Sequence, residues 1–120
     1  MGRHVVRRND EAQWRRQPSS GGGSEAQTKA LSPGDESTPQ VLLVKYAPGS
    51  YSGIHSHSQL DIMYVLEGDM KVGGRPCPKG AVVWTDKDTM YGPLEVGPQG
   101  VTLLDIRPAR ANTVWQSSKP

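Results

Sequence analysis

The sequence predicts an all-β fold, either a sandwich or a barrel. Short segments rich in Val, Ile, Leu and Tyr follow one another closely, and Gly or Pro residues separate them. Gly 14 and Pro 10 in 120 residues are more than an average domain uses, which suits many tight turns. No amphipathic helix pattern follows residue 17, and there is no internal repeat. A chain of this length has room for one domain with one hydrophobic core.

Six segments read as strands in chain order. Residues 41–47 end at a Pro-Gly turn signal, and residues 54–57 form a short second segment. Residues 61–67 (DIMYVLE) are rich in residues that favour a pleated surface. A hairpin turn at Gly68-Asp69 should follow, and residues 76–80 should form a loop. The other expected strands are residues 70–72, 81–85 and 101–107.

The residues before the first strand are expected to form a flexible extension, residues 1–40, partly disordered. Residues 17–40 are poor in large apolar side chains and read as a mobile loop or linker. One interpretation is a short edge strand near residues 4–8, with the Trp14 side chain packed on the domain. The alternative is a wholly disordered tail. The β-barrel is then placed at residues 41–110, and residues 111–120 form a C-terminal tail.

Charge and composition exclude several classes of partner. The net charge is +2 and the basic residues are scattered, so no basic surface for nucleic acid is expected. No apolar run is long enough to cross a membrane, and the N-terminus lacks the apolar core of a signal peptide. The lone cysteine, Cys77, suits a reducing compartment. We therefore expect a soluble, cytoplasmic protein.

Two histidines one residue apart are the first candidates for a site. His55 and His57 lie on the same face of an expected strand, because side chains alternate along it. Asp61 begins the next strand beside them. Two imidazoles and one carboxylate form the set that binds Fe(II) in non-haem oxygenases. The competing interpretation is a surface turn with an unrelated Asp61, because H-x-H alone is a weak signal.

The glycines around this set extend the pattern. Gly49, His55, His57, Asp61 and Gly68 follow the intervals G-x5-H-x-H-x3-D-x6-G. This resembles the first motif of the cupin superfamily, in which Glu usually stands where this chain has Asp61. The second cupin motif can be laid on the chain from Gly80, and it then places Tyr91 where a ligand histidine is usual. Of the residues in that second motif only the glycine is kept. The resemblance covers about residues 41–107.

The resemblance implies a double-stranded β-helix, or jelly roll, with a pocket inside. It also implies a divalent metal ion, with Fe(II) favoured and Mn, Ni, Zn or Cu as alternatives. The ligand candidates are then His55, His57 and Asp61, with Tyr91 as the weakest. Tyr91 could instead donate a hydrogen bond or a proton to a substrate, or simply fill the mouth of the barrel.

The leading hypothesis is a small cupin metalloenzyme that acts on a small organic molecule. Dioxygenation comes first, followed by isomerisation, cyclisation or dehydration by a Lewis acid. The alternatives are a non-catalytic ligand-binding or sensing cupin, and a metal-free isomerase, epimerase or cyclase. In that metal-free enzyme His55 or His57 is the base and Tyr91 the acid. The expected apolar pocket wall consists of Met63, Val65, Trp84 and Met90.

Alternation along residues 61–67 sorts their side chains into two faces. Asp61, Met63 and Val65 should face the interior, while Ile62 and Tyr64 face outward with Leu66. Both faces are largely apolar, so a second layer or a partner should cover the outer one. A homodimer is the expected arrangement, and homodimers are frequent in the cupin superfamily that the chain resembles.

Overall fold

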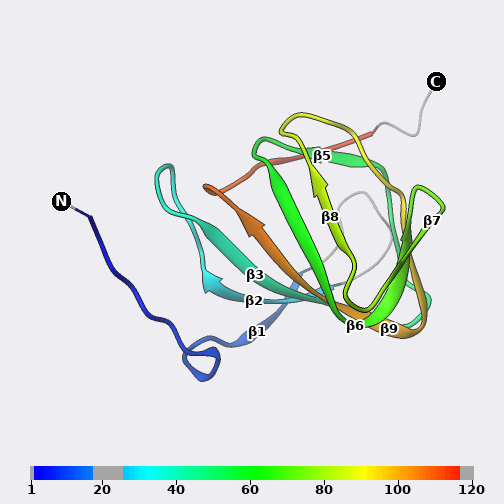
Figure 1. Ribbon diagram of the computed structural model, residues 1–120, viewed down its shortest axis with the longest axis horizontal. Helices are drawn as coiled ribbons and strands as arrows, with labels where there is room; N and C mark the ends of the chain where they lie inside the picture. The colour runs from blue at the N-terminus through cyan, green and yellow to red at the C-terminus, as the bar shows by residue number, and fades with distance from the viewer. Residues whose placement is uncertain (1, 18–25, 117–120) are drawn as a thin grey trace.

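The structure is a computed structural model that describes residues 2–17 and 26–116 (Figure 1). Nearly all regular structure in it is β, and a three-residue 3-10 helix, η1 (Asn9–Glu11), is the one helix among the described residues. The predicted all-β class is therefore confirmed. The strands are β1 (Trp14–Gln17), β2 (Ala26–Ser32), β3 (Gln40–Tyr46), β4 (Tyr51–Ser52), β5 (His55–His57), β6 (Asp61–Val72), β7 (Arg75–Pro78), β8 (Val82–Thr85), β9 (Leu94–Arg107) and β10 (Thr113–Trp115).

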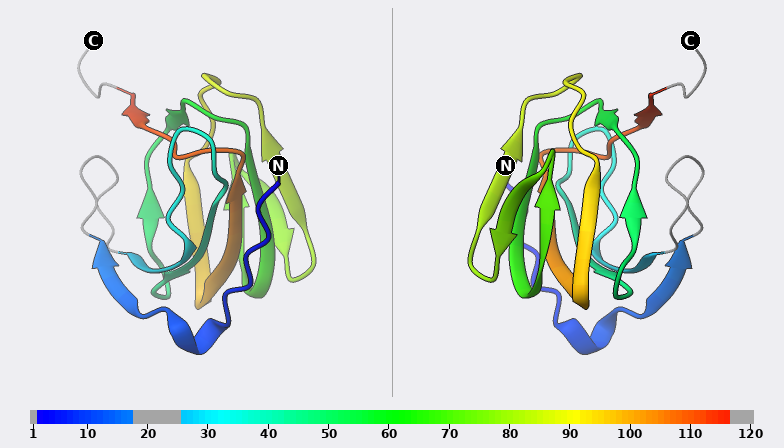
Figure 2. Two further views of the ribbon diagram at one scale, coloured as in Figure 1. Left: turned by 90° about the vertical axis from the view of Figure 1, so that its left-hand side faces the viewer. Right: turned by 90° about the vertical axis from the view of Figure 1, so that its right-hand side faces the viewer.

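One large antiparallel sheet curves around the interior, as both views of Figure 2 show. Its strand order is β1-β2-β3-β9-β6-β7, with β4 paired to β9 and β8 paired to β6. A second, two-stranded sheet joins β5 to the C-terminal β10. The residue His55 also makes an isolated bridge to Tyr91, which lies outside the strands. The two histidines thus come from a strand that stands apart from the large sheet.

The turn predicted at Gly68-Asp69 is wrong, because β6 continues through it as one twelve-residue strand. Gly68 lies at a register shift between β6 and β9, with φ +75. A Cβ there would collide with the carbonyl oxygen of Gly100, so glycine is needed for the close approach of the two strands. A further turn that the sequence predicts at Gly73-Gly74 is confirmed, because the chain reverses there into β7. Part of the loop predicted at residues 76–80 is therefore strand.

The N-terminal part is more ordered than its composition predicts. β2 pairs with β3 along its length, so the loop prediction for residues 17–40 is wrong over this strand, and residues 18–25 lie outside the described residues. Small side chains such as Ala26 and Ala30 carry little hydrophobic signal, and backbone pairing supplies the order instead. The edge strand expected near residues 4–8 is absent, and those side chains are exposed. No neighbouring strand offers them hydrogen bonds there.

Trp14 lies in the edge strand β1 and packs on lysine side chains. The ammonium groups of Lys29 and Lys45 lie 5.4 and 4.5 Å from its ring centroid. Both distances suit cation–π contacts. The sheet therefore begins well before residue 41, and β10 follows residue 110. The predicted barrel boundaries leave out strands at both ends.

The hydrophobic core fills one end of the barrel. The parity predicted for residues 61–67 is confirmed, since Asp61, Met63 and Val65 are buried while Tyr64 is exposed. The same alternation on β9 turns Asp105 and Arg107 inward. The interior is thus apolar at one end and polar at the other. The core residues are Val44, Met63, Val65, Met70, Cys77, Leu94, Val96, Val101 and Leu103.

Within the described ranges, no helix has the length and apolar character that a membrane crossing would require.

Candidate functional site

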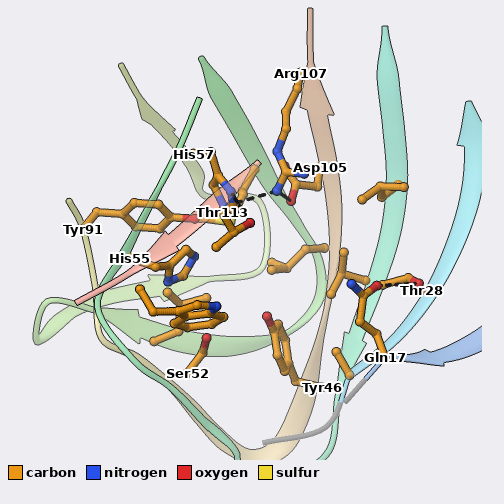
Figure 3. A pocket seen from close by; sticks show the side chains of 17 residues that line it. Gln17, Thr28, Tyr46, Ser52, His55, His57, Tyr91, Asp105, Arg107 and Thr113 are labelled. Carbon is orange, nitrogen blue, oxygen red and sulfur yellow. Dashed lines mark hydrogen bonds and ion pairs between the residues drawn. The ribbon is translucent and has the colours of Figure 1, made fainter. Parts of the chain in front are cut away.

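A cavity of about 230 Å³ lies at the polar end of the interior (Figure 3). It is bounded on one side by apolar side chains and on the other by titratable ones. The figure shows His55, His57 and Tyr91 grouped on one wall and Asp105 with Arg107 beside them. The apolar lining consists of Ala26, Leu42, Val44, Met63, Leu94, Leu103 and Trp115. The polar lining consists of Gln17, Thr28, Tyr46, Ser52, His55, His57, Tyr91, Asp105, Arg107 and Thr113.

The two histidines project from β5 into this cavity, with ring centroids 4.9 Å apart. His55 Nδ1 lies 2.7 Å from the carbonyl oxygen of Gly53. A carbonyl only accepts, so Nδ1 carries the hydrogen and Nε2 keeps its lone pair. No hydrogen-bond partner of His55 Nε2 is found among the described residues. His55 therefore offers a hydrogen-bond acceptor to whatever occupies the cavity.

His57 has both ring nitrogens engaged. Arg107 Nη2 donates to His57 Nε2 across 3.3 Å, and Thr113 Oγ1 lies 3.0 Å from Nδ1. Because arginine only donates, Nε2 is the acceptor and Nδ1 carries the hydrogen. Burial lowers the pKa of His57 to about 4, and the charge of Arg107 adds to this effect. Burial also lowers the pKa of His55, so both imidazoles are neutral at pH 7.

Arg107 is the centre of the polar network. Its Nε donates to Asp61 Oδ1 at 3.2 Å, and its Nη2 donates to Asp105 Oδ2 at 3.0 Å. Its Nη1 donates to Gln40 Oε1 at 2.8 Å. The residue is only 8% exposed, so these bonds form with little competition from water. A guanidinium is thus fixed beside His57 and between two carboxyl groups.

The carboxyl groups of Asp61 and Asp105 differ in how readily they lose a proton. Burial raises the pKa of Asp105 well above its ordinary value, and the neighbouring Asp61 raises it further. Burial also opposes ionisation of Asp61, but its hydrogen bond with Asp105 and the charge of Arg107 outweigh this and lower its pKa. Asp105 Oδ1 accepts no hydrogen bond from the described residues, as expected for a carboxyl oxygen that carries a proton.

Tyr91 extends the network toward the histidines. Its hydroxyl donates to Asp61 Oδ2 at 3.2 Å, and its ring centroid lies 4.7 Å from that of His55. Backbone hydrogen bonds in both directions fix Tyr91 to His55. Burial raises the pKa of Tyr91 above its ordinary value, and the charge of Asp61 acts in the same direction. The phenol therefore keeps its proton, which favours a hydrogen-bond donor over a phenolate ligand.

The predicted metal ligands lie close together, but a cation is already among them. His57 Nε2 and Asp61 Oδ2 are 3.6 Å apart, and Arg107 is hydrogen-bonded to both residues. A divalent ion about 4 Å from that guanidinium would meet a repulsion of about 8 kcal/mol at an effective dielectric constant of about 20. Among the described residues, no group of three or more His, Cys, Asp or Glu side chains could hold a metal ion. As arranged, these residues do not fit a divalent metal.

The residues predicted to form the pocket wall do not lie together in the structure. Met63 lines the cavity, whereas Val65 is fully buried in the core beyond it. Trp84 and Met90 are 64% and 47% exposed and lie outside the cavity, so their assignment to the wall is wrong. Trp84 pairs with Ile62, which faces outward, so the strand alternation turns Trp84 outward as well.

Several polar and aromatic residues of the site were missed from the sequence, among them Asp105, Arg107, Thr113 and Trp115. Asp105 and Arg107 were detectable, because alternation in VTLLDIR puts them on the same face as the buried Leu103. Thr113 and Trp115 gave no signal. They reach the cavity because β10 pairs with β5, where Thr113 lies opposite His57 and Trp115 opposite His55.

Comparisons with known proteins support the fold. The chain has a TM-score of 0.79 to an RmlC-like cupin protein from Ralstonia eutropha, at 13% identity over 97% of this chain and 74% of that one. It has a TM-score of 0.72 to an acetylacetone dioxygenase from Acinetobacter johnsonii, at 16% identity over 99% and 83%. For the polyketide cyclase RemF from Streptomyces resistomycificus the TM-score is 0.71, at 20% identity over 100% and 90%. Such identities establish the fold alone, and the predicted jelly roll is confirmed. A search of the curated proteins finds no match.

The sequence comparison is more specific about the family. Residues 2–107 match the family described as the ChrR cupin-like domain. That match spans most of the chain, including the N-terminal residues that the motif resemblance did not reach. The chain therefore belongs to the ChrR cupin-like family of the cupin superfamily.

Proposed function

We propose that this chain is a small-molecule cupin enzyme that transfers protons on an organic substrate with its own side chains. The reaction is of the isomerase, epimerase or cyclase type, with His55 as base and Tyr91 as acid. The observation that carries this proposal is that His55 Nε2 has no hydrogen-bond partner among the described residues, while the ring of His55 lies against that of Tyr91 at one wall of a cavity of about 230 Å³. The similarity of the fold to a polyketide cyclase agrees with such chemistry.

The cavity favours a small, largely apolar substrate with a carbonyl group. Its apolar wall suits a hydrocarbon body, while the polar end offers one acceptor and several donors. The charge of Arg107 is offset by Asp61, so the site favours an uncharged molecule. His55 Nε2 takes a proton from the carbon beside the carbonyl, and the electron pair moves to the carbonyl oxygen. Tyr91 turns its O–H from Asp61 to that oxygen and stabilises the enolate by a hydrogen bond, and His55 then returns a proton to the carbon.

The test is incorporation of solvent deuterium into simple carbonyl probes. Cyclohexanone, pyruvate and 4-hydroxyacetophenone are incubated with the protein in D₂O and followed by proton NMR. We expect exchange with at least one probe, and a loss of about 100-fold or more in His55→Gln and in Tyr91→Phe. Tyr64→Phe, which removes an exposed hydroxyl on the outer face, is the matched control and should exchange normally. Exchange that survives in His55→Gln overturns the assignment of the base.

The Fe(II) dioxygenase predicted from the sequence is the second candidate. Only the residue types His55, His57 and Asp61 and the similarity of the fold to an acetylacetone dioxygenase favour it, since Arg107 is hydrogen-bonded to two of the three residues. The measurement is oxygen uptake with acetylacetone after anaerobic loading with Fe(II). Uptake that disappears in His57→Ala would establish the oxygenase and displace the proton-transfer enzyme. Binding of the probes without exchange or oxygen uptake would favour a non-catalytic, ligand-binding cupin.

We also propose that a second copy of the chain covers the outer face of the large sheet. Two rows of apolar side chains cross four neighbouring strands there, and the outermost members on β8, Val82 and Trp84, are 58 and 64% exposed. Apolar areas of this kind mark interaction surfaces. The rows are Trp84, Ile62, Ile106 and Val41, and Val82, Tyr64, Leu104 and Leu43.

Light scattering after size exclusion tests the dimer. We expect the wild type to have twice the mass of one chain, and Trp84→Glu to be monomeric. Val114→Glu, which alters an exposed apolar residue of β10 away from this face, is the control. A monomeric wild type at micromolar concentration would contradict the dimer.

A further inference from the structure

We infer that Arg107 is the permanent cation of the cavity, and that it takes the position in which the predicted ligand residues would hold a divalent metal ion. The inference rests on the hydrogen bonds and ion pairs of Arg107. It does not depend on the proposed proton transfer, so either proposal can fail without the other.

The guanidinium uses the same atoms that a metal would need. Arg107 Nη2 donates to His57 Nε2 at 3.3 Å, and Arg107 Nε donates to Asp61 Oδ1 at 3.2 Å. A nitrogen lone pair that accepts this hydrogen bond is not available to a metal ion. The second oxygen of Asp61 accepts from Tyr91. Among the predicted ligand nitrogens, His57 Nε2 is thus engaged, whereas His55 Nε2 has no hydrogen-bond partner among the described residues.

Two further acceptors fix the guanidinium in place. Asp105, on the same strand β9, accepts from Nη2 at 3.0 Å, and Gln40 on the neighbouring β3 accepts from Nη1 at 2.8 Å. Gln40 and Arg107 are also register partners in the sheet. Four acceptors around one buried guanidinium leave it little freedom to leave the site. The position is therefore built by two strands and does not depend on a mobile side chain.

One donor of the guanidinium is left for a ligand. An arginine side chain has five N–H groups, and the contacts with Asp61, Asp105, His57 and Gln40 use four of them. The remaining N–H is on Nη1, and Arg107 lines the cavity. The charge that a metal ion supplies in a metal-binding site is supplied here by the chain itself.

The test is to remove the guanidinium and ask whether a metal site appears. Tag-free wild type, Arg107→Met and Arg107→Met/Asp105→Leu are titrated with Co(II) and Zn(II). Metal content is measured after gel filtration, and Co(II) coordination is followed by visible absorption. Circular dichroism shows which variants are folded. Loss of Arg107 takes a partner from both Asp61 and Asp105, and the double variant removes Asp105 while it keeps the ligand candidate Asp61, so at least one metal-site variant should fold.

We expect the wild type to bind neither ion below about 1 mM, and a folded variant without Arg107 to bind one ion at least about tenfold more tightly. That binding should be lost when His57→Ala is added. Arg110→Met, which removes an exposed arginine three residues away, is the matched control and should bind no metal.

Two results would overturn the inference. One is stoichiometric binding of metal to the wild type that requires His57. The other is a folded variant without Arg107 that still binds no metal, because the donors would then fail to converge even without the guanidinium. Neither result depends on deuterium exchange, which tests the proposed reaction separately.

Discussion

The two ends of the barrel interior are built from the same strands but in different ways. At the apolar end, Val65 and Met70 from β6 pack against Leu94 from β9 with no polar group among them. At the polar end, Asp61 from β6 meets Arg107 from β9, and β5 adds the histidines. The first end gains stability from burial. The second end buries charged groups, and hydrogen bonds to these groups offset the free-energy cost of their burial. The cavity lies at this second end.

The largest expected effect comes from breaking the polar end. Arg107→Leu leaves the buried Asp61 without its cation, and we expect a loss of about 3 to 5 kcal/mol in the free energy of unfolding. Arg107→Leu/Asp61→Leu removes both charges and should be more stable than the single variant. Urea denaturation followed by circular dichroism measures both. A double variant less stable than Arg107→Leu would show that the ion pair itself stabilises the fold.

The apolar end should respond to volume and not to charge. Met70 is 2% exposed in the core, and Met70→Ala should cost about 2 to 5 kcal/mol by leaving a cavity. Met90 is 47% exposed, so Met90→Ala should stay within about 0.5 kcal/mol of the wild type. The same urea titrations decide this. Equal effects of the two methionine variants would mean that this end is loosely packed.

Acid should weaken the polar end selectively through His57. Its pKa is about 4 in the folded chain against an ordinary 6.5, so between these values the unfolded chain binds a proton that the folded chain does not. The free energy of unfolding therefore falls as the pH drops from 6.5 to about 4, by up to about 3 kcal/mol. Asp105 acts in the opposite direction over the same range, because its pKa is raised. The effect of His57 is therefore measured as a difference in pH dependence between the wild type and a variant without this imidazole.

Comparison of the wild type with His57→Gln isolates this contribution. The loss of stability between pH 6.5 and 4 should be smaller in His57→Gln than in the wild type. Thermal unfolding at a series of pH values gives both curves. Parallel curves would show that the pKa of His57 is not lowered in the folded chain.

The contrast between the two ends also explains how much the sequence could predict. The strands, the inward parity of Asp61 and Met63, and the placing of His55 and His57 together all follow from alternation and spacing. Both are local patterns. The position of Arg107 beside His57 depends on the pairing of β6 with β9 and on the separate strand β5, and local pattern does not specify that pairing.

Other misses have the same physical origin. β2 contains small residues whose order comes from hydrogen bonds with β3, and β10 reaches the cavity only by pairing with β5. Trp84 reads as a core residue by its size, but strand parity turns it outward. In each case a pairing between distant segments determines the structure, and the sequence of one short segment does not specify that pairing.

The smallest expected effect is that of a change in Asp105, and it is best compared with the same change in Asp61. Asp105 holds a proton and Asp61 does not, so Asp105→Asn should cost no more than about 1 kcal/mol, because an amide can donate to Asp61 and accept from Arg107. Asp61→Asn removes the carboxylate that balances Arg107 and should cost about 3 kcal/mol or more. Urea denaturation at pH 7 compares the two variants. Equal losses would mean that both carboxyl groups are ionised, and that the guanidinium is balanced by two charges instead of one.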